Sequence, residues 1–359
     1  MLTEHFHNTQ KDTGHYSNDL RYVLSLQNTI AAFEEIKTWE GYAKTPLHSL
    51  DSMASDIGVK NIYYKDESSR FGLGSFKALG GTYGVLKFIH HALKKEIGDE
   101  VSMKDIHAGK YSEQISKYTV TTATDGNHGR SVAFGAKLFG CKCQIYIHSE
   151  VSSGRQKAME DLEATVNRIS GNYDASLQIC IEDAGKNNWY VISDTSYEGY
   201  TKYPRYIMAG YNVMAEEIID QIKDRPLPTH VFLQGGVGSF PGAICGYFWE
   251  KFPGNNIKFV VVESEHAPCL IRSAQNNQMT SVNIKQETMM AGLSCGEPSL
   301  LGWEILKSGT DDFITINDSS IPGLMRLLAK NNLKIEAGES SVAGLAGLIE
   351  SMEDQKIAE

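Results

Sequence analysis

The sequence predicts an α/β protein with two domains. Short β-branched and apolar runs alternate with helical patterns, which is typical of helices that cover a mostly parallel sheet. The chain has 359 residues, and a single hydrophobic core usually divides beyond about 250 residues. We therefore expect two lobes with a cleft between them, each a mostly parallel sheet covered by helices.

The predicted strands are short runs that are each followed by a loop or a helix. They are "NIYYKDE" from Asn61, "KYTVTTAT" ending at Thr124, "CQIYIHS" from Cys143, "WYVIS" from Trp189, "THVFLQ" ending at Gln234 and "IKFVVVES" from Ile257. In "GRQKAMEDLEATV", residues 154–166, apolar side chains recur at helical spacing. We expect a helix there, with one side packed on a sheet.

Composition narrows the class of partner. The net charge is −10, and the sequence lacks the dense Lys/Arg stripe of nucleic-acid binders, so we expect no nucleic-acid partner. The polar N-terminus lacks a signal-peptide pattern and no apolar run is long enough to cross a bilayer, so we expect a cytoplasmic protein without a membrane partner.

The six cysteines show no paired CxxC spacing, which predicts no metal site and reduced thiols. A Cys269–Cys295 disulfide stays an alternative.

The first glycine-bearing turn surrounds one lysine. In "FGLGSFKALGG", residues 71–81, Lys77 stands near a predicted helix start among Gly72, Gly74, Gly80 and Gly81. Small neighbours let a flat group approach the backbone, and the positive helix end favours the neutral amine that Schiff-base chemistry needs. A solvated surface lysine is the alternative. The spacing excludes a P-loop, because GxxxxGK[ST] is absent.

The second turn breaks a β-rich run at Asp125-Gly126-Asn127-His128-Gly129 and continues with helical spacing. Backbone N–H groups at such a junction suit a carboxylate or a phosphate. Asn127 can donate to an oxygen, and Asp125 can act as a base or hold an ammonium. Helix capping by Asp125 or Asn127 explains the same residues equally well.

The third turn, "HVFLQGGVGSFPGAICGYFWEKF", places three glycines between a strand and a helix, the geometry of a phosphate cradle. Gly236 and Gly238 followed by Gly242 also resemble the dinucleotide fingerprint, and Glu263 lies about where a ribose-binding acid would be. The spacing is one residue too long and Pro241 interrupts it. The pattern therefore disfavours a nicotinamide cofactor.

All three turns would open at the carboxyl ends of strands, where α/β sheets place ligands. They supply a lysine for an aldehyde, an asparagine for a ring oxygen and a glycine cup for a phosphate. These parts describe one cofactor, pyridoxal 5'-phosphate, which acts as an electron sink when a lysine holds it as a Schiff base.

Five segments in order carry a family resemblance: "KDESSRFGLGSFKALGG", "TDGNHGR", "DTSYEGYTKYP", "LQGGVGSFPGA" and "AGLSCGEPSLLGWEIL". They are similar to the motifs of the diaminopropionate ammonia-lyases, fold-type II pyridoxal-phosphate enzymes of the tryptophan synthase β-subunit and threonine dehydratase superfamily. The likeness runs from about Tyr42 to the end of the chain. It implies a homodimer whose subunit has a large cofactor-binding domain, residues 1–85 and 215–359, and a small domain, residues 86–214, that carries the Asp125–Asn127 loop.

The resemblance also implies roles for single residues. Lys77 would bind the cofactor aldehyde and Asn127 its 3'-oxygen, while the phosphate would be surrounded by Gly235, Gly236, Val237, Gly238 and Ser239. The implied reaction removes ammonia from 2,3-diaminopropionate and yields pyruvate and a second ammonia. Lys77 would take the α-proton of the L isomer and Asp125 that of the D isomer, and Asp194 would hold the β-amino group or assist its protonation. A cap or turn role explains Asp194 equally well without the resemblance.

The end of the sequence departs from the family. Members continue past "GESSVAGLAGLIESM" with a strand and an acidic segment that helps contact the pyridine nitrogen, whereas this sequence stops at "EDQKIAE". We expect the ring-nitrogen partner to be missing or replaced and activity to suffer. A serine or threonine deaminase of the same superfamily and a non-catalytic homologue that binds the cofactor remain alternatives.

Overall fold

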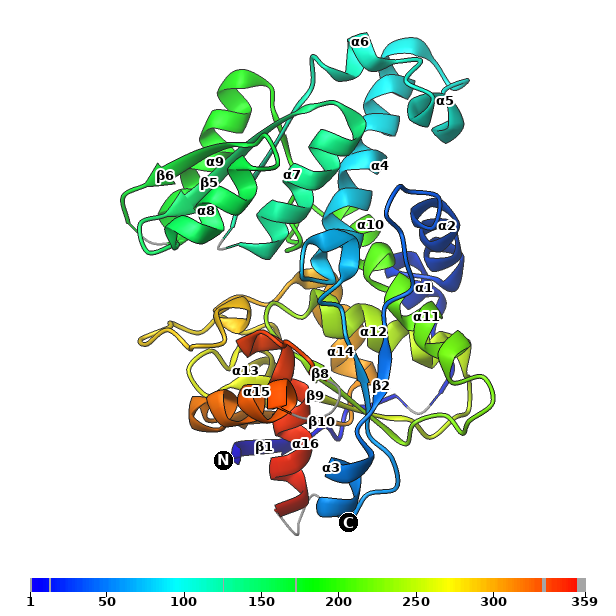
Figure 1. Cartoon of the computed structure of the whole chain (residues 1–359), viewed down its shortest axis with the longest axis vertical. Coiled ribbons are helices and arrows are strands. Elements are labelled where there is room, and N and C mark those ends of the chain that lie inside the picture. The colour runs from blue at the N-terminus through cyan, green and yellow to red at the C-terminus, as the bar shows by residue number, and fades with distance from the viewer. Residues whose placement is uncertain (1, 13, 125, 172, 331–333, 354–359) are drawn as a thin grey trace.

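Two four-stranded sheets and one short two-stranded sheet form the framework of the protein (Figure 1). The computed structural model describes residues 2–12, 14–124, 126–171, 173–330 and 334–353. Helices alternate with most of the strands along the chain. The α/β class and the two mostly parallel sheets that the sequence predicts are confirmed.

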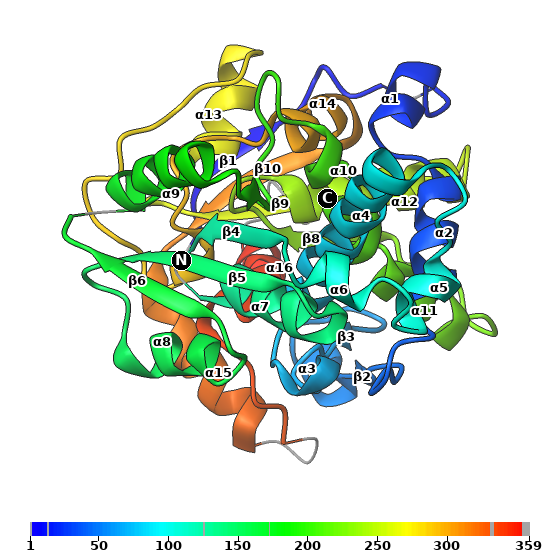
Figure 2. The same cartoon turned by 90° about the horizontal axis from the view of Figure 1, so that it is seen from above.

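The first sheet contains three of the predicted strands. Its members are β4 (Thr119–Ala123), β5 (Lys142–His148), β6 (Thr165–Ile169) and β7 (Tyr190–Val191). The order is β6-β5-β4-β7, and all neighbours are parallel. Helix α9 (Tyr173–Asn187) lies on one face, and α7 (Asn127–Phe139) and α8 (Ser153–Glu160) lie on the other (Figure 2).

The helix expected over residues 154–166 is wrong in its second half. Helix α8 ends at Glu160, and Glu163 then takes a left-handed backbone with φ 65°. Thr165 and Val166 belong to β6, which pairs with β5. β-branched side chains favour strands, and this preference outweighs the helical spacing that Val166 shares with the apolar residues before it.

The second sheet has one antiparallel edge. Its members are β1 (Leu2–His7), β8 (His230–Gln234), β9 (Lys258–Ser264) and β10 (Asp312–Ile316). The order is β1-β10-β9-β8, with β1 antiparallel to β10 and the other neighbours parallel. The sequence predicts β8 and β9 but neither β1 nor β10. The antiparallel pair of β2 (Leu47–Ser49) and β3 (Tyr63–Lys65) forms the third, small sheet.

Helices pack on the second sheet and between the two sheets. Helix α16 (Ala343–Glu353) contacts β8, β9 and β10, while α12 (Ser239–Lys251) contacts β8 and packs against α14 (Leu300–Gly309). The remaining helices are α1 (Asn18–Val23), α2 (Leu26–Ile36), α3 (Asp51–Asp56), α4 (Lys77–Ile97), α5 (Met103–His107), α6 (Ser112–Ile115), α10 (Lys202–Tyr211), α11 (Val213–Gln221), α13 (Cys269–Asn276) and α15 (Ile321–Lys330). Four 3₁₀ turns complete the described elements: η1 (Arg70–Gly72), η2 (Ala291–Leu293), η3 (Asp318–Ser320) and η4 (Glu339–Val342).

One apolar cluster joins the two sheets. It contains Ile145 of β5, Val261 of β9 and Leu86 of α4. Helix α4 continues across residue 85, so the predicted large and small domains divide within a helix. The boundaries of residues 1–85, 86–214 and 215–359 stay a prediction. Within the described ranges, no helix is both long enough and apolar enough to cross a bilayer.

Candidate active site

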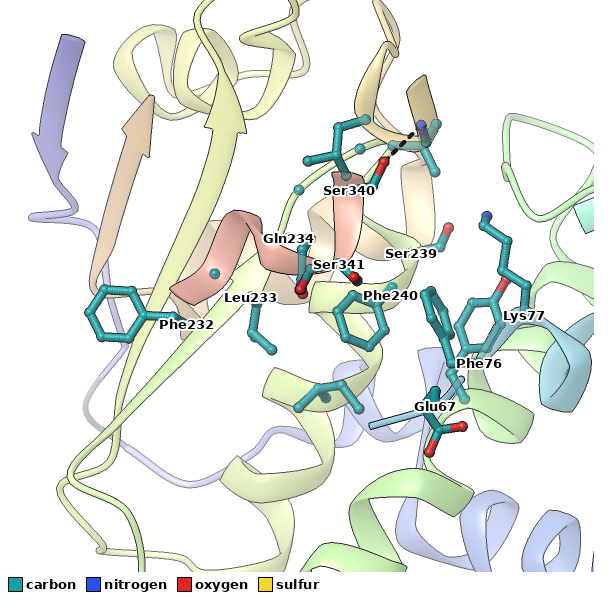
Figure 3. A pocket seen from close by; sticks show the side chains of 18 of the residues that line it. Glu67, Phe76, Lys77, Phe232, Leu233, Gln234, Ser239, Phe240, Ser340 and Ser341 are labelled. Atoms are coloured by element: carbon teal, nitrogen blue, oxygen red, sulfur yellow. Dashed lines mark hydrogen bonds between the residues drawn. The ribbon is translucent and has the colours of Figure 1, made fainter. Parts of the chain in front are cut away.

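One cavity of about 1490 Å³ contains most of the predicted site residues. Its lining includes Lys77, Asn127, Asp194, Gly235, Gly236, Val237 and Ser239. Apart from Asp194, which follows β7, these residues come from the three predicted turns, so the structure brings those turns together. Figure 3 shows Lys77 and Ser239 pointing into this space, with Phe76 and Phe240 beside them. Asp125 lies outside the described residues, and its predicted role stays a prediction.

Lys77 is the first residue of α4. The turn before it has a left-handed backbone at Phe71, Gly72 and Gly74, with φ 49°, 69° and 68°. The glycines after it have another purpose, since a Cβ on Gly80 would lie 2.3 Å from the Tyr211 ring. A Cβ on Gly81 would likewise clash with the Ser131 side chain. The prediction that all four glycines clear space for a flat ligand is therefore wrong for Gly80 and Gly81, which let α4 pack closely on α10 and α7.

A buried charge cluster holds the turn that leads to Lys77. Arg70 is 1% exposed, and its guanidinium donates to both carboxylate oxygens of Glu67 and to both of Glu217, at 2.8–2.9 Å. Lys65 donates to Glu217 at 2.8 Å, and Tyr42 does so at 2.9 Å. Two cations and two carboxylates balance, and each carboxylate has several donors, which is what buried charges require. The cluster fixes the turn to α11.

Asp194 contacts the Lys77 side chain. Lys77 Nζ donates to Asp194 Oδ2, and Tyr211 OH donates to the same oxygen at 3.5 Å. His128 Nδ1 lies 3.7 Å from it. Burial alone would raise the pKa of Asp194, but His128 and Lys77 outweigh it and hold the pKa well below its usual value. Asp194 is therefore an ionised carboxylate beside the lysine at neutral pH.

His128 has a structural partner. Burial lowers the pKa of its imidazole, although Asp194 opposes the shift. Its Nε2 donates to the carbonyl oxygen of Ile192 at 2.8 Å. This bond links the start of α7 to the segment that follows β7, which leads directly to Asp194.

Asn127 is the first residue of α7 and is exposed. The cap of this helix comes from Thr124, whose Oγ1 accepts from the backbone N–H groups of Gly126 and Gly129 at 3.0 and 3.1 Å. Capping therefore does not explain the Asn127 side chain, which can donate to a ligand in the cavity.

The glycine cup, residues 235–239, connects β8 to α12. Gly236 and Gly238 have φ 59° and 94°, and α12, which is 13 residues long, begins at Ser239. The unpaired N–H groups of a helix start attract an anion, and left-handed glycines turn further N–H groups toward it. With Lys77 in the same cavity, these residues fit the phosphate and the aldehyde of pyridoxal 5'-phosphate.

Glu263 cannot bind a ribose. It is 1% exposed, and its two carboxylate oxygens accept from the N–H groups of Leu270 and Ile271 at 2.8 and 2.7 Å. Both carboxylate oxygens therefore bind the start of α13 and are not directed at a ligand. The nicotinamide alternative is left without the acidic residue that would bind the ribose.

Comparison with known proteins agrees with this site. The family model of pyridoxal-phosphate dependent enzymes matches residues 38–359. The diaminopropionate ammonia-lyase of Escherichia coli (strain K12) is 38% identical over 312 residues, which are 86% of this chain and 77% of the relative. The chain belongs to the diaminopropionate ammonia-lyase family.

A solved structure of the same enzyme and a more distant relative are similar as well. A crystal structure of the Escherichia coli family member, in complex with an aminoacrylate-PLP azomethine intermediate, superposes with a TM-score of 0.87 at 34% identity, covering 100% of this chain and 89% of that one. A "probable D-serine dehydratase" of Carboxydothermus hydrogenoformans is 26% identical over 334 residues, covering 87% of this chain and 76% of the relative. The fold-type II architecture and the pyridoxal-phosphate cofactor of the family are thus confirmed.

The structure adds cavity residues that the sequence did not single out. Ser340 and Ser341 of η4 line the cavity opposite Lys77 (Figure 3). Ser340 Oγ accepts from the N–H of Gly292 at 3.0 Å, and Gln234 donates to the Ser341 carbonyl oxygen at 2.8 Å. Both serines belong to the segment "GESSVAGLAGLIESM", for which the sequence predicts no role in the site.

The cysteines bring no further chemistry to the site. Cys269 carries a free thiol, so the alternative Cys269–Cys295 disulfide is not formed. Among the described residues, no group of three His, Cys, Asp or Glu side chains is arranged to hold a metal ion.

Proposed function

We propose that this protein is a pyridoxal-phosphate dependent ammonia-lyase that converts 2,3-diaminopropionate to pyruvate and ammonia. The observation that carries the proposal is the Lys77–Asp194 contact in the cavity that the glycine cup also lines. An amine for the cofactor and a carboxylate for a second substrate amine then stand side by side. The named activity of the 38% identical relative supports the same substrate.

The bound cofactor would supply an electron sink for negative charge at the substrate α-carbon. Lys77 would hold its aldehyde carbon, Asn127 would donate to its 3'-oxygen, and the N–H groups of the glycine cup would hold its phosphate. Lys77, once displaced by the substrate amine, would take the α-proton of the L isomer. Asp125 is proposed to do so for the D isomer, from the opposite face.

Asp194 is proposed to bind the β-ammonium of the substrate. An ionised carboxylate attracts an ammonium more strongly than it attracts a hydroxyl, particularly away from bulk water. The lowered pKa of Asp194 keeps it ionised across the neutral range. The same group can return a proton to the leaving amine only if the substrate raises that pKa.

The test compares Lys77→Ala with Lys95→Ala, an exposed lysine at the other end of the same helix. We measure pyruvate release from D- and L-diaminopropionate with added pyridoxal phosphate. Lys77→Ala is expected to lose nearly all activity and Lys95→Ala to keep it. Full pyruvate release by Lys77→Ala would refute the proposal.

A serine or threonine deaminase is the second candidate, favoured by the similarity to the "probable D-serine dehydratase". Rates on diaminopropionate, serine and threonine separate the two, and a clear preference for a hydroxy amino acid would overturn the substrate. A visible cofactor band without turnover on any of them would support the non-catalytic alternative.

The proposal extends to domains, assembly and location. We propose a large domain of residues 1–85 and 215–359, a small domain of residues 86–214, and a homodimer; the family resemblance supports all three. A cytoplasmic location fits the free thiols of buried cysteines such as Cys245. Light scattering tests the homodimer, and cell fractionation tests the cytoplasmic location.

A further inference from the structure

Ser196 caps a helix that lies more than a hundred residues away in sequence. It follows Asp194 by two positions and is 1% exposed. Its Oγ accepts from the N–H of Leu301 at 2.8 Å, and its carbonyl oxygen accepts from the N–H of Leu300 at 2.8 Å. These are the first two N–H groups of α14, which receives no side-chain cap from the preceding residue, Ser299. The Asp194 segment is thereby attached to the start of α14.

Ser299 connects this attachment to the glycine cup. Its Oγ accepts from the N–H of Ser196 at 2.9 Å and lies 2.7 Å from Ser196 Oγ, in a hydrogen bond that either hydroxyl can donate. Its own N–H donates to the carbonyl oxygen of Val237 at 2.7 Å. Ser299 is fully buried. A continuous chain of hydrogen bonds therefore runs from the cup to Ser196.

The other end of the segment is fixed to the cup as well. Ser239 Oγ, at the start of α12, donates to the carbonyl oxygen of Asp194 at 2.6 Å. The tripeptide from Asp194 to Ser196 is thus held at both ends by residues in or next to the cup. Its one charged side chain contacts Lys77, with Tyr211 and His128 also facing it.

We propose that Ser196 and Ser299 are positioning residues that hold the Asp194 carboxylate against Lys77 and keep it in register with the glycine cup. Ser196 is among the residues that line the cavity, whereas Ser299 is not. Ser299 therefore acts on the site through Ser196 and the Asp194 segment. The inference rests on the proposed function of the site. Small displacements of a positioned group cost up to about a hundredfold in rate.

The experiment uses the protein loaded with pyridoxal phosphate and the variant Ser299→Ala. Ser176→Ala is the matched control, because Ser176 is also fully buried with one hydroxyl hydrogen bond, in α9. S299T keeps the hydroxyl and serves as the rescue. If S299A does not fold, Ser299→Cys, which has nearly the same shape and a weaker acceptor, takes its place.

Three measurements follow the position of Asp194. In S299A, backbone hydrogen exchange is expected to accelerate about tenfold or more in the peptide containing residues 193–199. The pH midpoint of the visible absorbance of the lysine-bound cofactor is expected to move to lower pH, because a loosened carboxylate stabilises the protonated nitrogen less. The kcat is expected to fall about 10- to 100-fold with a smaller change in KM. S299T should restore all three, and S176A should change none.

The outcomes separate this inference from the proposed function. If wild type binds the cofactor and turns over while S299A matches S176A in exchange, pH midpoint and kcat, the positioning role is refuted. If wild type shows no visible band with added pyridoxal phosphate, the proposed function itself fails. A fall in thermal stability of S299A without a shift in pH midpoint would show a purely structural role and would also refute the inference.

Discussion

The turn before Lys77 and the glycine cup are both rich in glycine, but their glycines meet different needs. Gly72 has φ 69°, and a Cβ there would touch nothing within 4 Å. Gly238 has φ 94°, and a Cβ there would lie 3.1 Å from Leu270. The lysine turn needs only an unusual backbone, which the buried Arg70 cluster holds in place. The cup needs that backbone and close packing at once, so its shape is fixed by its own neighbours.

Removing the cluster should have the largest effect on the lysine turn. Arg70→Met leaves Glu67 and Glu217 buried without their main partner, and we expect the free energy of unfolding to fall by about 3–5 kcal/mol. Arg21→Met is the control, because the Arg21–Glu250 pair is 2.8 Å long but the Arg21 side chain is 46% exposed. It should cost less than about 1 kcal/mol in the same urea titration. Equal losses in both variants would contradict the stabilising role of the buried Arg70 cluster.

Alanine at one glycine of each turn should separate their roles. Gly72→Ala and Gly238→Ala each force a side chain into the left-handed region, which costs about 1–2 kcal/mol of stability. Only Gly238→Ala should also weaken binding of pyridoxal phosphate, by about tenfold, which corresponds to about 1.4 kcal/mol. Equilibrium dialysis measures the affinity. If both variants bind the cofactor equally well, the glycine cup does not hold the phosphate.

The Lys77–Asp194 ion pair should make stability depend on pH. The pKa of Asp194 is lowered in the folded protein, so its contribution to stability is present above the unfolded value near 4 and is lost as pH falls through the folded value. Wild type should therefore be more stable than Asp194→Asn at pH 7. The difference should shrink as the pH falls below about 4. A difference in denaturation midpoint that stays constant from pH 7 to pH 3 would show that the charge of Asp194 contributes nothing.

A glycine outside both turns should show the smallest effect, with the opposite sign. Gly185 lies inside α9, and a Cβ there would touch nothing within 4 Å. Gly185→Ala is expected to raise the free energy of unfolding by about 0.5–1 kcal/mol, because alanine favours a helix. Cofactor affinity should not change. A lower free energy of unfolding in Gly185→Ala would mean that open space around a glycine does not predict the effect of an alanine substitution in this fold.

The parts of the site that the sequence predicts are those encoded within one turn. Lys77 at a helix start, Asn127 after β4 and the cup after β8 each follow from a local pattern of strand, glycine and helix. Arg70 and Glu217 are 147 positions apart, and Ser196 and Ser299 are 103 apart. A contact over such a distance leaves no periodic signal in the chain. The edge strand β1 was missed for a related reason, since its half-exposed residues "LTEHFH" show no clear alternation of apolar and polar side chains.

Lys77 and the glycine cup should together bind one molecule of pyridoxal phosphate. Borohydride reduction traps the bond between a lysine nitrogen and the cofactor aldehyde carbon, and peptide mapping then locates it. We predict one pyridoxyl group per chain, on Lys77, and none after loading with pyridoxal that lacks the phosphate at the same concentration. A label on another lysine, such as Lys87 of the same helix, would show that Lys77 does not hold the cofactor.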